Sequence, residues 1–444
     1  MQAKNIILGQ SFPLVAENYN YVWHIPKGAG WYYVLAGVFM FSNANPLAPK
    51  LLTPLVGIAT IAIAFFLLKL RFNLKTAIFT SVLLAISPAL VDESHLIWPP
   101  FIVFLPVVLF LYSVFKILEG RQKYAILAAV SIGLMAQFEV TIAFFYGVYS
   151  LLLIPFAIKR KYLNFRTTFY FLLTLFLFVV PFIVDDILHG AYSSGGIVIL
   201  IQNLGKGAHR SLMYILGQRL DTFIWNFRST FTPNIPKSIG LLVTICAGAY
   251  LYLRDKKIEQ SKKIFILFLS LAPLVKFALL FFYPDDLRGW WFLDLIVVYC
   301  FLLGIILAYF LTKPKLKMLS VAIILSLILI SLNRVWVTFK SEEFGKNIIT
   351  QTAPVEYIYN DARGQKFNVI LLDTTQIRYD FNYLFWWYGS KKYGYQPSVA
   401  KQKLLYYILI DNSTSHAVLP KDLSRKVVET RIFPPDVTVK KIIN

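Results

Sequence analysis

The sequence predicts an all-α polytopic membrane protein that ends in a small α/β domain. Of its 444 residues, 57% are apolar and only 15% are charged, whereas soluble domains carry about 25% charged residues. The apolar residues form long runs that suit the hydrocarbon core of a bilayer, about 30 Å thick. The C-terminal part instead contains short β-branched runs. A single soluble domain is therefore excluded.

Apolar runs bounded by charge predict about ten transmembrane helices. They lie near residues 51–70, 77–91, 97–117, 124–138, 141–158, 167–184, 238–253, 264–283, 290–312 and 318–333. The segment 28–42 is shorter and rich in glycine, so we interpret it as an interfacial helix with Trp31, Tyr32 and Tyr33 at the level of the lipid headgroups. Residues 1–50 are then part of a first outer loop.

The distribution of charge predicts the orientation of the helices. Basic residues gather in alternate short loops, which is typical of cytoplasmic loops. They are Lys69, Arg71 and Lys75; Lys116, Arg121 and Lys123; Lys159, Arg160, Lys161 and Arg166; Arg254, Lys256, Lys257, Lys262 and Lys263; and Lys313, Lys315 and Lys317. Most carboxylates of the membrane domain fall in the opposite loops. The net charge of +21 is thus assigned to membrane-flanking loops, and no nucleic-acid partner is expected.

Ten helices in this orientation place both chain ends outside the cytoplasm. The first residues contain no apolar stretch typical of a signal peptide, so we expect a first transmembrane helix upstream of Met1. Residues 51–333 form the predicted transmembrane domain. Residues 334–444 form the predicted extracytoplasmic α/β domain, with strands in KFNVILLDTT and LLYYILIDN and a helix across PVEYIYNDA. The connection 185–237 is too long for a simple turn and is expected to cover a site.

The strongest local motif is SPALVDESHLIWPP, which brings Asp92, Glu93 and His95 to the outer end of a span. Ionisable groups at a membrane boundary are candidates for function because an unpaired charge is costly there. Adjacent carboxylates also suit Mg²⁺ or Mn²⁺, so a divalent cation is a candidate cofactor. The alternative is that the two acids only cap or solvate the end of the helix and have no role in function.

Two further clusters lie at predicted outer ends. Asp185 and Asp186 close one span, and Arg288 precedes the span that contains Asp294. A guanidinium grips phosphate oxygens through two donors, so Arg288 is the candidate phosphate ligand; a salt bridge to Asp285 is its alternative. Asp294 lies inside a span, where a carboxylate normally faces a polar cavity.

Other residues carry weaker signals. His24 precedes the interfacial helix and is a candidate substrate contact, although a lone histidine among aromatic residues is more often packed. Arg210, Arg219 and Arg228 recur every nine residues, as in an amphipathic helix attracted to anionic headgroups. Glu139 lies at the turn between two predicted spans, and this position accounts for a charged residue there as well as a functional site would. The chain has no P-loop, GxSxG, HExxH or CxxC motif, which argues against an ATP-driven pump, a serine hydrolase and a zinc protease.

The segments NIILGQSFPL, HIPKGAGWYYVLAGVFMFSNANPLAPK and LLAISPALVDESHLIWPP resemble the first part of bacterial membrane glycosyltransferases of the GT-C superfamily. This group includes dolichyl-phosphate-mannose protein mannosyltransferases and the lipid A aminoarabinose transferase. The resemblance covers residues 5–120 by pattern. The resemblance implies an acidic general base upstream of NIILGQSFPL. This sequence has no such residue, because Glu17 lies after that segment. The resemblance also matches Asp92 and Glu93 to further acids of the second outer loop. Arg288 matches lipid-phosphate-binding residues by position alone.

The sequence thus predicts an integral membrane glycosyltransferase that moves a hexose or pentose from a polyprenyl-phosphate donor to a glycan, lipid or protein acceptor on the outer face of the cytoplasmic membrane. Asp92 and Glu93 are the predicted catalytic residues. The predicted substrate-binding residues are Arg288, His95, His24, Asp185, Asp186 and Asp294. The main alternative is a transporter or flippase of lipid-linked saccharides, which needs polar or charged residues through the depth of its helices. A third possible function is that of a non-catalytic membrane scaffold that presents the outer domain.

Overall fold

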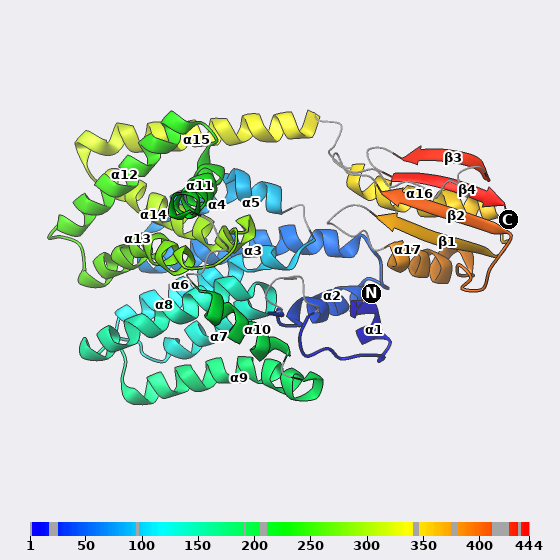
Figure 1. Cartoon of the computed structure of the whole chain (residues 1–444). Helices are drawn as coiled ribbons and strands as arrows, with labels where there is room; N and C mark the ends of the chain where they lie inside the picture. Colours follow the sequence, from blue (N-terminus) through cyan, green and yellow to red (C-terminus); the bar gives the residue numbers. More distant parts are fainter. Residues whose placement is uncertain are drawn as a thin grey trace. The chain divides into compact units, whose positions relative to one another are not determined.

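The computed structural model describes residues 2–16, 25–94, 97–190, 192–204, 211–340, 346–373, 381–410, 426–433 and 437–443. The chain forms two compact units. Unit 2 comprises Phe12–Leu35 and Lys50–Arg334, and unit 1 comprises Met1–Ser11, Ala36–Pro49 and Val335–Asn444. Figure 1 shows the elements of each unit.

Unit 2 is helical and accounts for all ten predicted spans. Its helices are α3 (Ala48–Arg71), α4 (Leu74–Ile86), α5 (Pro88–Glu93), η1 (Pro99–Ile102), α6 (Phe104–Leu118), α7 (Tyr124–Phe138), α8 (Val140–Lys159), α9 (Phe165–His189), α10 (Tyr192–Asn203), α11 (Leu212–Phe231), α12 (Ile235–Arg254), α13 (Gln260–Phe281), η2 (Gly289–Phe292), α14 (Leu293–Phe310) and α15 (Pro314–Lys340). Among the described residues, eight helices are long and apolar enough to cross a membrane, and α4 and α7 are shorter apolar helices. The predicted polytopic helical class is confirmed.

Helix α14 is the centre of unit 2, because all of its residues are buried. It packs against α4, α11, α12 and α13. Gly304 allows the close approach to α4, since a Cβ atom there would lie 2.8 Å from the Thr80 Cα atom. Small residues permit such close backbone contacts between membrane helices.

The five predicted cytoplasmic loops meet at one end of unit 2. Arg71 lies 3.5 Å from Glu119, and Lys313 donates to Asp255 at 2.6 Å. Gln122 Nε2 donates to the Lys161 carbonyl, and the Lys262 ammonium lies over the Phe72 ring. These contacts join all five loops, so their predicted location on one side of the bundle is confirmed. Which side of the membrane they face stays a prediction.

Two local expectations are wrong. The span predicted at 77–91 breaks at Ser87, because Pro88 disfavours helical backbone in the preceding residue and lacks an N–H. The connection 185–237 is not a simple turn, as predicted, and contains α10 and α11. Segment 28–42 does contain a helix, α2 (Gly30–Phe41), but Trp31 is buried against Ile102 and Phe138 and does not face headgroups.

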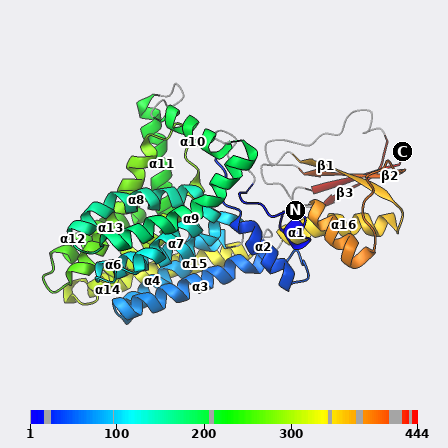
Figure 2. The same ribbon diagram turned by 90° about the horizontal axis from the view of Figure 1, so that it is seen from below.

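Unit 1 is a mixed sheet covered by helices. Its elements are α1 (Gln2–Ile7), α16 (Lys346–Ala362), β1 (Phe367–Asp373), α17 (Phe381–Tyr388), η3 (Gly389–Tyr393), β2 (Leu404–Ile410), β3 (Val427–Phe433) and β4 (Val437–Ile443). The strand order is β1-β2-β4-β3, with β1 and β2 parallel. Figure 2 shows α16 on one face of the sheet. The predicted small α/β domain is confirmed, whereas β3 and β4 were not predicted.

Candidate functional site

Cations and tryptophans form a chain of contacts at the end of unit 2 opposite to the basic loops. The Lys27 ammonium lies 5.9 Å from the Trp98 ring centroid, the Trp98 and Trp290 rings are 4.8 Å apart, and the Arg288 guanidinium lies 6.0 Å from the Trp290 ring. We call these four residues the cationic rim. Arg288 is exposed, so its charge is presented at the surface of this end. Cations over tryptophan faces are held in place by the ring quadrupole.

The rim continues into a buried chain of alternating charges. Lys27 donates to Glu139 at 2.6 Å, and the Glu139 side chain is only 1% exposed. Glu139 also interacts electrostatically with Lys276. The Lys276 ammonium, which packs over the Phe292 ring, forms an ion pair with Asp294. We call Lys27, Glu139, Lys276 and Asp294 the buried charge chain.

Asp294 therefore has a different setting from the one predicted. It is fully buried and bonds to Lys276, so the carboxylate faces a neighbouring helix and not a polar cavity. The reason is that a buried charge without a partner is strongly destabilising, and Lys276 on α13 lies directly opposite. Lys276 was not predicted, although a lysine within the apolar run 264–283 is the kind of signal that indicates a buried partner.

Helix α11 fixes the segment that carries Arg288. Arg219 is buried and donates to the carbonyl oxygens of Tyr283 and Asp285 at 2.6 and 2.8 Å. Asn226 Nδ2 donates to the Phe292 carbonyl at 3.1 Å. The prediction that Arg219 contacts anionic headgroups is wrong, because its buried guanidinium donates to backbone carbonyls.

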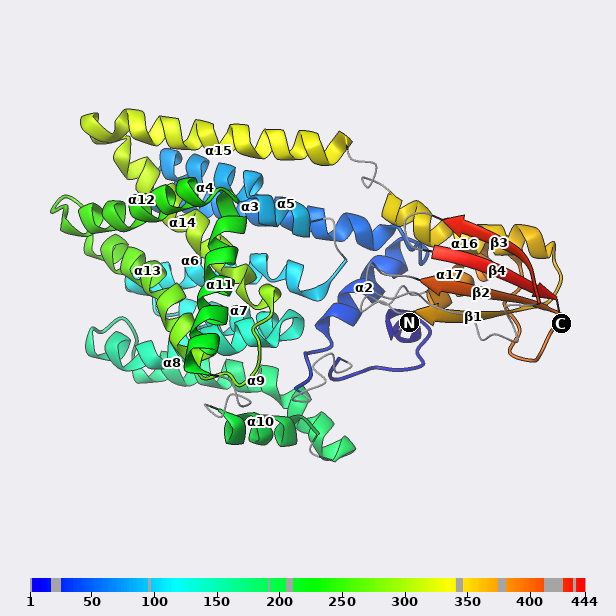
Figure 3. The same cartoon turned by 45° about the horizontal axis from the view of Figure 1, so that its top comes forward.

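The same helix fixes α5, which carries Asp92 and Glu93. The Ser87 hydroxyl donates to the Thr230 carbonyl at 2.9 Å in a buried contact, and α11 packs against α5. Figure 3 shows α11 beside α5 and the segment that leads to α14. Two candidate regions that are about 200 residues apart in the sequence are thus anchored to one helix.

Asp92 and Glu93 differ in their surroundings. Asp92 is exposed and forms an ion pair with Arg334 near the end of α15. Glu93 is half-buried, and burial together with the negative charge of Asp92 raises its pKa to about 7. A carboxyl group with such a pKa exchanges protons near neutral pH, as a general base requires.

Asp185 and Asp186 belong to another part of unit 2. Asp185 lies 2.9 Å from His189 Nδ1 within α9, and Asp186 accepts from the Ser194 N–H at 2.8 Å. Figures 1 and 3 place α9 and α15 on opposite flanks of the unit. The structure therefore does not group these two acids with the Asp92–Arg334 pair. His24, His95, Arg210 and Glu17 lie outside the described residues.

The described residues contain no group of three or more histidine, cysteine or acidic side chains that could hold a metal ion. Asp92 is already paired with Arg334, so Glu93 is the remaining carboxylate of the SPALVDESHLIWPP motif that could bind a metal ion. These residues do not form a complete protein-based metal site, so we derive no catalytic step through a metal.

No family model matches the chain, and no curated protein matches it. Among solved structures, ArnT from Cupriavidus metallidurans bound to undecaprenyl phosphate has a TM-score of 0.58 at 10% identity, over 99% of this chain and 92% of that one. The same protein in the apo state has a TM-score of 0.54 at 9% identity, over 95% and 90% of the two chains. An oligosaccharyltransferase from Archaeoglobus fulgidus in complex with Zn and sulfate is more distant, with a TM-score of 0.44 at 14% identity, over 84% and 55%.

The chain therefore has an ArnT-like fold over nearly its whole length. The predicted fold class, a helical membrane domain with a small C-terminal α/β domain, is confirmed.

We expect the buried charge chain to behave non-additively in stability measurements. Lys276→Met or Asp294→Leu alone should lower the free energy of unfolding by about 3–5 kcal/mol, because each leaves one buried charge unpaired. The double variant should lose less than either single variant. Thermal and denaturant unfolding in detergent micelles measure these differences, and strictly additive losses would contradict the pairing.

Arg219→Leu should lower the free energy of unfolding by about 3 kcal/mol, since two carbonyl groups lose a charged donor. Arg228→Leu is the matched control: Arg228 also lies on α11 but donates to the Pro233 carbonyl in an exposed contact, and it should cost less than about 1 kcal/mol. Equal losses in the two variants would show that Arg219 does not anchor the Tyr283–Asp285 segment.

Proposed function

We propose that this protein is a membrane glycosyltransferase. It transfers a hexose or pentose from a polyprenyl-phosphate donor to a hydroxyl or amino group of a glycan, lipid or protein acceptor at the outer face of the cytoplasmic membrane. The fold supports this proposal because ArnT, which shares it over 99% of this chain, was crystallised with undecaprenyl phosphate. In this proposal the chain is multi-pass and unit 1 is extracytoplasmic.

The cationic rim is the observation that carries the proposal. Arg288 and Lys27 flank a pair of tryptophan rings near the ends of candidate spans. A polyprenyl chain stays in the bilayer while its phosphate reaches the interface, where a guanidinium binds phosphate oxygens through two donors. Tryptophan is suited to the same interface because its ring is amphipathic.

The chemical step we propose is a direct displacement at the anomeric carbon. Glu93 takes the proton of the acceptor O–H or N–H, and the acceptor atom forms a bond to C1 of the sugar. The bond between C1 and the phosphate oxygen breaks, and its electron pair leaves with the polyprenyl phosphate. Arg288 stabilises the charge that this phosphate gains. The donor arrives activated, so no nucleotide is consumed.

Glu93 is the preferred base of the two predicted catalytic acids. Its pKa of about 7, raised by burial and by Asp92, is suited to proton transfer at neutral pH. Asp92 forms an ion pair with Arg334, so we assign it a positioning role beside Glu93. This assignment includes no step through Mg²⁺ or Mn²⁺, and a metal requirement stays a prediction.

The remaining predicted substrate contacts have different roles in this proposal. Asp294 does not contact the substrate directly in this proposal, because its carboxylate is bonded to Lys276. Asp185 and Asp186 lie where α9 meets α10, so they are proposed contacts of the acceptor and not of the phosphate. His24 and His95 stay predictions from the sequence alone.

The rival function, a transporter or flippase of lipid-linked saccharides, receives less support. Among the described residues, the buried charges on candidate spans are Lys116, Asp185, Lys276 and Asp294. Each lies within two turns of a helix end, whereas a carrier places polar groups and broken helices at the membrane midplane. Three of the four, Asp185, Lys276 and Asp294, lie at the end opposite to the basic loops, which is more consistent with chemistry at that membrane surface.

Arg288→Ala should lower the rate of sugar transfer by roughly 10²–10³-fold, the usual effect of removing one group that stabilises a leaving oxyanion. Transfer from a radiolabelled polyprenyl-phosphate sugar to extracted cell-envelope acceptors measures the rate. Arg166→Ala, which removes an exposed arginine in a predicted cytoplasmic loop, should leave it unchanged. Undiminished transfer in Arg288→Ala would remove the phosphate assignment. Labelled lipid that crosses vesicle membranes without transfer would support the flippase.

The transfer rate should depend on the ionisation of Glu93. Because the carboxylate is the active form and its pKa is about 7, the rate should rise with pH, reach half of its maximum near pH 7 and level off above it. Asp92→Asn should move this rise to lower pH, since it removes a negative charge that raises the Glu93 pKa. Glu93→Gln should lower the rate by roughly 10²–10⁴-fold and abolish the rise. A pH profile of Glu93→Gln with the same rise would assign the base elsewhere.

A further inference from the structure

Strand β3 forms an outer edge of the sheet in unit 1, because the strand order is β1-β2-β4-β3. Figure 1 shows β3 along one side of the sheet, beyond β4. The five side chains from Val428 to Ile432 are all exposed. An edge strand presents backbone N–H and C=O groups that can pair with a strand of another chain, so this edge is open to a partner.

The edge is regular over most of its length. A β-bulge lies between Val427 and Glu429, and from Glu429 to Phe433 each residue is in register with one residue of β4. Bulges and charged side chains commonly protect edge strands from pairing with other chains. The bulge is confined to the start of β3, so the protection of the regular part depends on its two charged residues, Glu429 and Arg431.

These charges complement those of a second β3 that runs in the opposite direction. When two copies pair antiparallel with Thr430 opposite Thr430, Glu429 of each copy faces Arg431 of the other. The same register places Val428 opposite Ile432, whose exposed fractions in the single chain are 62% and 69%. Opposite charges and apolar side chains that face each other directly stabilise a pair of strands. A pair centred on Glu429 or on Arg431 would place like charges opposite each other, which is destabilising.

One side chain of α16 contacts both charged residues of the edge. The Arg431 guanidinium lies 4.7 Å from the centroid of the Tyr357 ring, and the Tyr357 hydroxyl interacts with the Glu429 carboxylate. The Tyr357 ring also packs against Phe433, with the ring centroids 5.8 Å apart. Side chains that are already held in place lose less conformational freedom when a partner binds. The charged face of β3 is thus organised before any second strand arrives.

We propose that two copies of this chain associate through β3, with a two-fold axis at Thr430. The two four-stranded sheets then join edge to edge, and the same residues of both copies form the contact, as in an isologous interface. A second copy supplies the complementary charges by symmetry, whereas an unrelated strand would match them only by chance. This interface lies in unit 1 and is independent of the proposed sugar transfer.

Charge reversal in the full-length protein tests the proposal. The protein carries one fluorophore per chain and is reconstituted in vesicles, and single-molecule photobleaching counts the dimers across a range of protein-to-lipid ratios. Glu429→Arg or Arg431→Glu places like charges opposite each other in both symmetric pairs. The ratio at which half of the chains are dimeric should therefore rise by at least about tenfold. Glu429→Arg combined with Arg431→Glu exchanges the two charges and should restore the wild-type ratio. Lys401→Glu reverses an exposed charge elsewhere in unit 1 and should have no effect.

Disulfide cross-linking tests the register. In a Cys246→Ser background, Thr430→Cys places two thiols opposite each other, with their Cα atoms roughly 4.5–5.5 Å apart, within the range of disulfides. Mild oxidation should then give a covalent dimer. Val399→Cys, at a fully exposed position of the same unit, should not. Wild-type protein that stays monomeric at every ratio overturns the proposal. A double charge variant as weak as the single ones also overturns it, as does equal cross-linking at the two cysteine positions.

Discussion

The requirement that buried charges be paired within an apolar helical bundle is the constraint on which unit 2 depends. The cost of an unpaired ion in a low-dielectric interior is several kcal/mol. Among the described residues, the buried side chains of Glu139, Lys276 and Asp294 each have a partner of opposite charge, and the buried Arg219 donates to backbone carbonyls. Lys276 pairs with Asp294, and Lys27 pairs with Glu139. These pairs join the N-terminal segment, the α7–α8 turn and the α13–α14 hairpin, which are distant in the sequence. Charge pairing thus determines which helix ends meet.

Helix α11 anchors the two segments that carry the candidate site residues. Its side chains and backbone hold both the Tyr283–Phe292 segment, through Arg219 and Asn226, and the start of α5, through Thr230. Backbone that leaves regular helix inside a membrane protein must have its polar groups satisfied by protein or water. By supplying those partners, α11 supports the irregular segment before α14, which carries Arg288, and the break at Ser87 before α5, the short helix that carries Asp92 and Glu93.

Most of the fold follows from the sequence, because span length and loop charge are local properties. Apolar runs located all ten helices, and basic loops predicted which ends lie together. The contacts of the candidate site could not be predicted, because they are long-range. Nothing local in 185–237 shows that Arg219 reaches the Tyr283 carbonyl. The break at Ser87 was a local miss, because Pro88 was given too little weight within a continuous apolar run. Asp294 was found as an intramembrane acid, but its partner depends on how α13 packs against α14.

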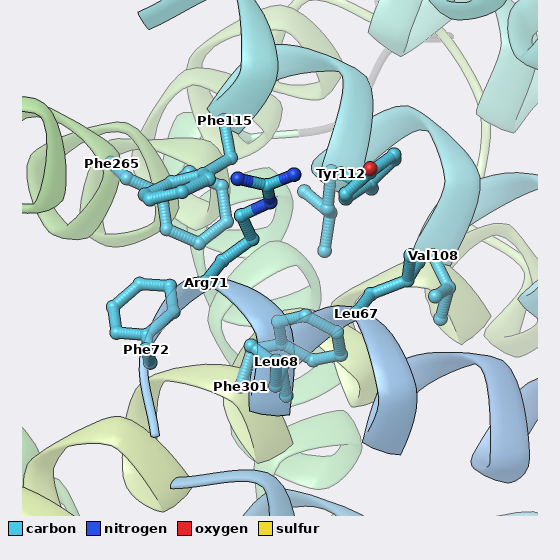
Figure 4. A pocket seen from close by; sticks show the side chains of 10 residues that line it. Leu67, Leu68, Arg71, Phe72, Val108, Tyr112, Phe115, Phe265 and Phe301 are labelled. Atoms are coloured by element: carbon cyan, nitrogen blue, oxygen red, sulfur yellow. The ribbon is translucent and has the colours of Figure 1, made fainter. Parts of the chain in front are cut away.

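Arginine has different surroundings at the two ends of the bundle. At one end Arg288 is exposed beside Trp290, so in the proposed function it can exchange ligands as substrates bind and leave. At the other end Arg71 (Figure 4) lies 3.5 Å from Glu119, which also accepts a hydrogen bond from Lys116, so its charge is used within the protein. An exposed guanidinium stays hydrated when a phosphate departs, and release of the product phosphate then leaves no unsolvated charge. Turnover is therefore proposed at the cationic rim and not at the basic end.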